Sequence, residues 1–577
     1  MVETIDTDVL VIGSGIAGCR AAIEAQGQGS SVLLTTKSLF KKGGATVCAY
    51  GFTRAPVYAP GDSDQLQFFR WLTTSGLLAD QELMKIIIDG SIAGVRDLEE
   101  LGVRWARNPD GSYIMTGFPG APPCDIASPQ KNGETGKAFI DALGGRVRRL
   151  GINILEETIV TKLLTSENQV VGATALRIQS GEFFVIKSKS TVLATGAADA
   201  CFRTRAGSDD TTGDGYSLAY RAGAELTNME LQSFTMNNMT PPTVPSTWDG
   251  TVAMPAGFML PTQEGPLYLY SDGKPLGKPE DRDRPHVIAN EFFEAARLHK
   301  AIVADASKIV QTINECTILP EYARKIGFDL RREKAFLTFS AHMNSGGVRI
   351  NDRCESTLRS LYATGGVSAC SGQKLLIDGL VLGKIAGRNA AENAREGLGE
   401  TRVDEKQVEN EERRVFAPLQ DARKEQLSSP FSPPRVKLAI QDVMTDKYTV
   451  VKNEKSMLEA LQALEKIRLE MVPKMRLSSD TRVFNLDWRD YLEVFFMLDA
   501  SELIVRPSLM RKESRGNFRR EDYPNMDNDN WLKNIVIKIK KKEGNDQEAS
   551  MDLHTVPIEF KYVKPEDMLK AMQNSPS

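Results

Sequence analysis

The segment Asp8-Val-Leu-Val-Ile-Gly-Ser-Gly-Ile-Ala-Gly18 sets the architecture of the N-terminal domain. Its first five residues, Asp8–Ile12, form a short β-prone run, and glycines follow at positions 13, 15 and 18. An alanine-rich stretch, Cys19–Gln26, predicts a helix, and Ser31–Thr35 predicts a second strand. In such a β-α-β unit the glycines allow a tight turn and a close approach to a pyrophosphate, which the N–H groups of the helix N-terminus can bind. The segment therefore predicts a Rossmann-like dinucleotide site.

The composition is that of an ordinary globular protein with several domains. A chain of 577 residues exceeds one hydrophobic core, so we expect roughly two to four domains. Hydrophobic residues make up 41%, charged residues 26%, and the formal net charge is −4. These values speak against a general nucleic-acid surface.

Two further features concern the cellular compartment. The start MVETIDTDVLVIG enters a strand at once, and apolar runs such as Val9–Ile12 fall far short of the roughly 20 residues that cross a bilayer. The seven cysteines are scattered without a CxxC pair, which argues against an intrinsic zinc site or iron–sulfur cluster and suits a reducing compartment. We therefore expect a cytoplasmic chain without a metal site of its own.

The choice of dinucleotide follows from two observations. The second strand ends in Leu34-Thr-Thr-Lys37, without the acidic residue that commonly binds the ribose of NAD. Glycine-rich segments recur in three separate parts of the chain, and an extended dinucleotide such as FAD requires several close backbone approaches. Each segment alone could be a flexible linker, but their order favours FAD.

Changes in composition predict an α/β protein with a Rossmann-like FAD-binding domain that is interrupted by an insertion. Residues from about Met236 to Glu280 are rich in Pro, Gly, Met and aromatic side chains, and Gly346–Gly397 returns to strand, glycine turn and helix. Amphipathic helices are predicted over Glu405–Met471, and strands over 535–539 and 556–562. We expect five segments: the first part of the FAD-binding domain (1–235), an α+β capping domain (236–335), the second FAD-binding part (336–402), a helical domain (403–485) and a small C-terminal domain (486–577).

Many short motifs resemble the flavoprotein subunit of succinate dehydrogenase and fumarate reductase, in the same order and over nearly the whole chain. The likeness extends to L-aspartate oxidase and the adenylylsulfate reductase flavoprotein. The motifs are Thr36-Lys37, Gly43–Gly51, Glu134-Thr-Gly136, Val192–Gly196, Thr212-Gly-Asp-Gly215, His342–Val348, Leu361–Gly366, Leu376–Gly383 and Leu509–Gly516.

The resemblance implies bound FAD and a set of residues beside it. Many respiratory members link FAD covalently through a histidine, but Ala45 stands at that position here, so the resemblance implies non-covalent FAD. The implied cofactor residues are Gly13, Gly15, Ala17, Gly18, Thr36, Lys37, Gly44, Ala45, Thr46, Gly51, Ala194, Thr195, Gly196, Asp214, Gly366 and Leu376.

The substrate pocket departs from the family pattern. Thr235 stands where the family has a dicarboxylate-binding histidine, and the segment Cys370–Lys374 lacks the family's arginine. A lysine such as Lys374 supplies charge but not the planar fork that binds a carboxylate through two parallel hydrogen bonds. The resemblance therefore implies a substrate other than fumarate or succinate, such as a monocarboxylate, a thioester or another conjugated carbonyl compound.

Three residues are the catalytic candidates implied by the resemblance. Arg284, with Arg282 as its rival, would be the proton donor or acceptor, and Glu264 would relay the proton. His342 would stabilise developing negative charge, and Ser345, Thr235 and Lys374 would line the substrate. The alternative interpretations are that Arg284 is an exposed residue in a charged turn and that His342 is a buried structural residue.

Three functions remain open at the level of sequence. The first is a flavoprotein subunit that moves a hydride equivalent between flavin N5 and a small saturated or unsaturated acid derivative, with electrons passing to an iron–sulfur subunit. The second is a stand-alone oxidase or sulfur-compound reductase of the same fold, and the third is an assembly subunit without turnover. Because no clustered cysteines could hold an electron relay, the first function requires a separate partner. Such a partner could also attach the chain to the inner face of the membrane.

Overall fold

The architecture comes from a computed structural model of the chain. It describes residues 2–49, 53–54, 72, 75–113, 115–116, 125–126, 135–240, 268–270, 274, 291, 294–295, 298, 302–305, 307, 327, 329, 332–370, 372, 374–397, 402–424, 430–542 and 545–567.

The FAD-binding domain is built on a seven-stranded sheet. The strand order is β6-β2-β1-β9-β8-β7, and β16 also pairs with β9. Strands β6, β2, β1, β9 and β16 are mutually parallel, while β7 and β8 run antiparallel to their neighbours. The bounds are β1 Glu3–Ile12, β2 Val32–Thr35, β6 Asn153–Leu155, β7 Thr158–Ser166, β8 Gln169–Arg177, β9 Glu182–Leu193 and β16 Leu361–Ala363.

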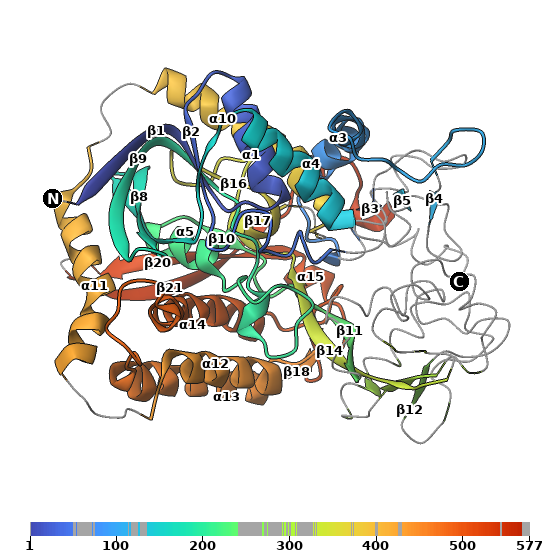
Figure 1. The fold of residues 1–577 in the computed structure, drawn as a ribbon. Helices are drawn as coiled ribbons and strands as arrows, with labels where there is room; N and C mark the ends of the chain where they lie inside the picture. The colour runs from blue at the N-terminus through green and yellow to red at the C-terminus, as the bar shows by residue number, and fades with distance from the viewer. Residues whose placement is uncertain are drawn as a thin grey trace.

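Helices cover this sheet because the central strands are buried on both faces, as parallel strands with continuous apolar runs require. Helix α1 packs along α10, and α3 and α4 flank them (Figure 1). The α1–α10 contact is close because small residues face each other: an added Cβ on Gly383 would lie 2.7 Å from the carbonyl oxygen of Ala17. The bounds are α1 Ile16–Gly27, α3 Gln81–Glu100, α4 Thr135–Arg149 and α10 Leu376–Glu396.

A four-stranded sheet with the order β11-β14-β13-β12 leads from the FAD-binding domain into the insertion. Its long strands, β11 (Gln232–Thr240) and β14 (Ala335–Asn344), are antiparallel and form the lower right part of Figure 1. The short strands are β12 (Tyr268–Tyr270) and β13 (Ile302–Ala304). The boundaries that we placed near 235 and 336 therefore fall at or within these strands, and most of the predicted capping domain lies outside the described residues.

The C-terminal region shares a third sheet with the FAD-binding domain, in the order β17-β15-β10-β20-β21. Strand β20 pairs with β10, so the end of the chain is built into the same body. The second predicted strand, 556–562, is displaced: β21 ends at Pro557, which has no N–H for the ladder. The bounds are β10 Leu226–Thr227, β15 Gly347–Arg349, β17 Ser368–Ala369, β20 Lys533–Lys542 and β21 Asn545–Pro557.

The helices of the predicted segment 403–485 pack against a helix that follows this segment in the sequence. Helix α14 packs against α12, α13 and α5, although its sequence lies beyond that segment. Buried residues such as Trp488, Phe496 and Leu503 lie on several sides of α14, so it needs neighbours around most of its circumference. Within the described ranges, no helix combines the length and apolarity that a membrane crossing requires. The bounds are α5 Asp214–Ala222, α11 Glu405–Lys424, α12 Pro433–Lys447, α13 Glu454–Lys466 and α14 Leu486–Met510.

Candidate functional site

The glycine fingerprint forms the tight strand-to-helix turn that its sequence predicts. Gly13 donates its backbone N–H to Thr35 O (2.9 Å) and has φ +108°, a conformation that side chains with a Cβ rarely adopt. A Cβ on Gly18 would overlap the carbonyl oxygen of Gly13, so the helix can start this close to the strand only with glycine. The turn thus presents backbone, not side chains, to a ligand at the carboxyl edge of β1.

The N-terminus of α1 points its free backbone donors to the same edge. Gly15 occupies the N-cap position and has no side chain to cap the helix. The Ile16 N–H is bound by Thr46 Oγ1 at 3.1 Å, which brings the predicted segment 44–46 to the start of the helix. Uncapped N–H groups at a helix N-terminus attract phosphate oxygens, so this corner fits a pyrophosphate.

Two buried hydroxyl groups lie just beyond the ends of the neighbouring strands and make no hydrogen bond with the described residues. Thr195 follows β9 and Thr364 follows β16, and neither Oγ1 atom has a hydrogen-bond partner among the described residues. A buried hydroxyl without a partner costs free energy, and a polar ligand relieves that cost. Ligands of open α/β sheets bind outside the carboxyl ends of such strands. The hydroxyls, the glycine turn and the uncapped helix together fit an extended dinucleotide.

Lys37 and Asp214, both predicted to lie beside the cofactor, are in direct contact. Lys37 Nζ lies 2.9 Å from Asp214 Oδ2 and 2.8 Å from Glu493 Oε1, and it donates a hydrogen bond to Thr212 Oγ1 (2.7 Å). Burial alone would raise the pKa of Glu493, but the positive charges of Lys37, Lys437 and Arg489 outweigh it and lower the pKa below its usual range. The Lys37 ammonium therefore belongs to an internal ion-pair cluster.

The segment that resembles the flavin-linking region is held by an aspartate. Gly44 N–H donates to both carboxylate oxygens of Asp210, at 3.0 and 3.1 Å. The Ala45 side chain between Gly44 and Thr46 is a methyl group, which offers no nitrogen for a covalent bond to FAD. Thr36 Oγ1 accepts a hydrogen bond from Ser14 Oγ at 2.8 Å, which ties the second strand to the glycine turn.

Asp210 and Glu493 hold predicted cofactor residues, but the sequence analysis did not identify them. Glu493 lies in the middle of α14, in a part of the chain with no nucleotide-binding motif. Only its burial (2% exposed) marks it, since a buried carboxylate needs a cation. The signal for Asp210 was weaker still: an acidic pair, Asp209-Asp210, just before the Thr212–Gly215 motif.

His342 lies on β14, at the sheet that leads into the insertion. Its neighbour Ala341 pairs with Phe234, and Ser340 pairs with Thr235, so the backbone positions predicted for the substrate are adjacent. The side chain is exposed to solvent. The surrounding protein lowers its pKa from 6.5, because it disfavours the protonated ring, and the exposure of the ring limits this effect. A small molecule can thus reach a histidine that is neutral at pH 7.

The other predicted substrate residues bind the protein itself. Ser345 Oγ donates to the carbonyl oxygen of Gly372 (2.6 Å). Lys374 Nζ donates to the carbonyl oxygens of Gly346 and Gly366, the latter at 2.7 Å. Arg284, Arg282, Glu264, Gly51 and the side chain of Thr235 lie outside the described residues.

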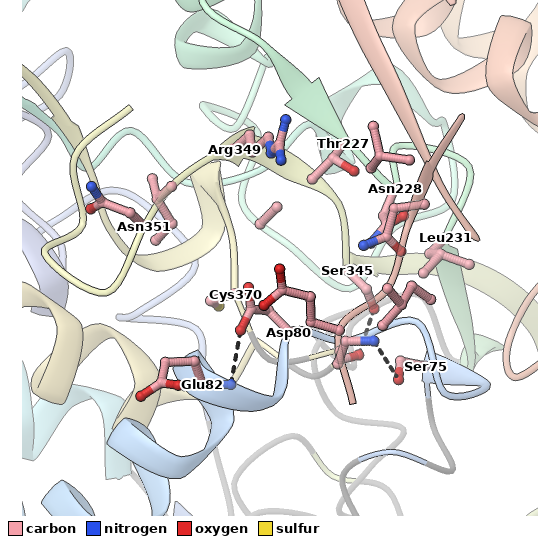
Figure 2. Close-up of a pocket in the computed structure, with 18 of the residues that line it drawn as sticks. Ser75, Asp80, Glu82, Thr227, Asn228, Leu231, Ser345, Arg349, Asn351 and Cys370 are labelled. Atoms are coloured by element: carbon pink, nitrogen blue, oxygen red, sulfur yellow. Dashed lines mark hydrogen bonds between the residues drawn. The ribbon is translucent and has the colours of Figure 1, made fainter. Parts of the chain in front are cut away.

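A polar pocket of about 450 Å³ lies behind the Ser345–Gly372 contact (Figure 2). Ser345, Cys370 and Asp80, the N-cap residue of α3, are among the residues that line it. Asn228 adds a carboxamide oxygen that is buried and has no partner among the described residues. The pocket does not include the glycine fingerprint, so it is separate from the dinucleotide corner.

Comparisons with known proteins agree with this geometry. Residues 8–375 match the FAD binding domain family, and residues 437–568 match the fumarate reductase flavoprotein C-terminal family. An uncharacterised FAD-dependent oxidoreductase of Methanocaldococcus jannaschii is 30% identical, over 93% of this chain and 97% of its own length. One subunit of the fumarate reductase (CoM/CoB) of Methanothermobacter marburgensis is 29% identical, over 93% and 98%.

Solved structures show the same fold over the whole chain. The Mycobacterium smegmatis Sdh1 complex in its apo form contains a chain that is 25% identical and superposes with a TM-score of 0.83. The superposition covers 99% of this chain and 98% of that one. Adenylylsulfate reductase from Archaeoglobus fulgidus superposes with a TM-score of 0.78 at 19% identity, which shows a shared fold alone.

Proposed function

This chain belongs to the family of FAD-dependent fumarate reductase and succinate dehydrogenase flavoproteins, and we propose that it acts on a substrate other than their dicarboxylates. As a member it is an FAD-binding oxidoreductase. The proposed reaction moves a hydride equivalent between the cofactor and a small saturated or unsaturated monocarboxylate, thioester or other conjugated carbonyl compound.

The observation that carries this proposal is an accessible, neutral histidine, His342, on two paired strands whose sequences contain no lysine or arginine. Neither β11 nor β14 contains an arginine or lysine in its sequence. A histidine whose pKa is lowered from 6.5 is mostly uncharged at pH 7, so it can donate a hydrogen bond to a carbonyl oxygen but does not form a stable ion pair with a carboxylate. A site lined by these two strands therefore suits the oxygen of a thioester or ketone better than a second carboxylate.

The roles of the residues follow from the chemistry of a polarised C=C bond. Bound FAD supplies or accepts the hydride at N5. His342 donates a hydrogen bond to the oxygen on which negative charge develops, and this hydrogen bond strengthens as that charge grows. Arg284, or Arg282 in its place, transfers the proton on the opposite face, with Glu264 as relay and Thr235 and Ser345 as lining.

The proposed partner is a separate iron–sulfur protein that carries electrons to or from the flavin. Its support is the absence of paired cysteines in this sequence and the name of one relative, which is one subunit of a fumarate reductase. We place the complex in the cytoplasm, with attachment to the inner face of the membrane through the partner as the alternative.

Anaerobic titration of the oxidised protein tests the enzymatic proposal. Saturated acyl thioesters, monocarboxylates and succinate are added in turn while the flavin absorbance is followed. Bleaching by a thioester or monocarboxylate supports the proposal. If no saturated compound bleaches the flavin and no α,β-unsaturated counterpart reoxidises the reduced protein, the chain is an assembly subunit without turnover. Rapid reoxidation by oxygen alone favours a stand-alone oxidase.

A further inference from the structure

The ammonium group of Lys374, a half-buried side chain, contacts three oxygen atoms of the protein. It donates hydrogen bonds to the carbonyl oxygens of Gly346 and Gly366, and it lies 3.5 Å from the phenolic oxygen of Tyr216. Tyr216 in turn donates its hydroxyl to Gly366 O at 2.8 Å. An ammonium has three hydrogens, so these contacts leave none directed at a substrate.

These contacts place the positive charge of Lys374 between two parts of the site, the FAD-binding segment and the strand that holds His342. Gly366 follows Gly365, and a Cβ added at Gly365 would lie 2.8 Å from the Cβ of Ala17 in the fingerprint helix. Gly346 follows β14, the strand that holds His342. The junction thus lies between the N-terminus of α1, which would hold the pyrophosphate, and the strand that holds His342.

The group is charged at neutral pH. Burial lowers the pKa of Lys374 to about 8, and nearby Cys370, Asp199 and Asp378 oppose that shift. Burial also raises the pKa of Asp199, to about 7, and keeps the pKa of Tyr216 well above its usual range. Lys374 is therefore mostly protonated at pH 7.

We propose that Lys374 sets the reduction potential of the bound flavin, as a fixed positive charge between the FAD-binding segment and the substrate strand. Reduction adds negative charge to the ring system, and a cation in a poorly solvated site stabilises that charge. The lysine thus favours the reduced cofactor, and it is a positioning residue that acts without touching substrate. This inference rests on FAD binding and is independent of which substrate the protein uses.

The test is the midpoint potential of purified protein with bound FAD, measured anaerobically against reference dyes and without substrate. K374M and K374Q remove the charge, and K374Q keeps an amide donor for the two carbonyls. Both should shift the equilibrium toward oxidised flavin by about tenfold, which is about 30 mV for a two-electron couple. K374R should restore the original value, and K447M, which removes an exposed lysine of the helical domain, should not change it.

The unaltered protein supplies a second measurement that does not depend on how the variants fold. Its potential should fall more steeply with pH near pH 8, because Lys374 loses its charge there. Unchanged potentials in K374M and K374Q, or a potential that falls along one straight line from pH 7 to 9.5, would overturn the assignment.

Discussion

Lys37, just after β2, and Glu493, in the middle of α14, form an ion pair of 2.8 Å whose side chains are 12% and 2% exposed. Lys437 of α12 shares the same carboxylate. The cluster therefore joins the FAD-binding domain to the helical domain at the carboxyl end of β2. It fixes the position of this end of the strand relative to α14. Each charge has an opposite partner, so the cluster is stable only while it is complete.

Removal of one charge should destabilise the protein strongly. K37M leaves Glu493 and Asp214 with one cation fewer, and loss of one partner of a buried pair costs about 3–5 kcal/mol. The free energy of unfolding, from urea titration followed by circular dichroism, should fall by that amount, and FAD should bind more weakly. The matched control is K447M, which breaks the exposed Lys447–Glu459 pair and should cost about 0–1 kcal/mol. Equal losses in the two variants would show that the cluster is not structural.

The flavin should be released on denaturation. Ala45 offers no side-chain atom for a covalent link, so acid precipitation should transfer all the yellow colour to the supernatant. The supernatant absorbance and the fluorescence of the denatured band on a gel measure the two fractions. Flavin fluorescence on the band would mean that another residue forms a covalent bond.

The titration of His342 should contribute to acid instability. Its pKa in the folded protein is lowered from the 6.5 of the unfolded chain, so the unfolded chain binds more protons as the pH falls below 6.5. This contribution to stability is complete above pH 6.5 and is lost as the pH falls through the pKa of the folded protein. Thermal unfolding at pH 7 and pH 5 should therefore show a smaller loss for H342Q than for the unaltered protein. An equal loss in both proteins would show that folding does not lower the pKa of His342.

Electron exchange should require another polypeptide. Affinity purification of the chain from its native cells, followed by mass spectrometry and iron analysis, should recover an iron–sulfur protein in near-equal amount. A lone flavoprotein that turns over rapidly with oxygen would instead support the stand-alone oxidase.

The local pattern of the sequence predicted the N-terminal fold closely. The expected strand over Asp8–Ile12 is the end of β1, and the expected helix Cys19–Gln26 lies within α1, which begins three residues earlier at Ile16. Alternation of apolar residues, glycine spacing and helix propensity each depend on residues that are close in the sequence. They can therefore be recognised without knowledge of tertiary contacts. The family resemblance and the FAD cofactor were confirmed by the matches to the two family models.

Features that depend on distant contacts were not predictable in this way. The sequence of α14 alone does not say that it packs on α12 and α13, and nothing near Lys37 indicates Glu493. Lys374 was expected to line the substrate because it is a cation in the right segment, but its contacts with Gly346 and Gly366 depend on how three chain segments meet. The assignments of Arg284 and Glu264 remain predictions.

The central claim, a substrate other than fumarate or succinate, is tested most directly by reoxidation of the reduced protein. The flavin is photoreduced without oxygen, mixed in a stopped-flow instrument with fumarate, an α,β-unsaturated monocarboxylate or an α,β-unsaturated thioester, and followed by its absorbance. Loss of two charged hydrogen-bond partners weakens binding by roughly two to four decades, so fumarate should react at least about 100-fold more slowly than the best of the other two. Reoxidation by fumarate as fast as by either other compound would contradict the account.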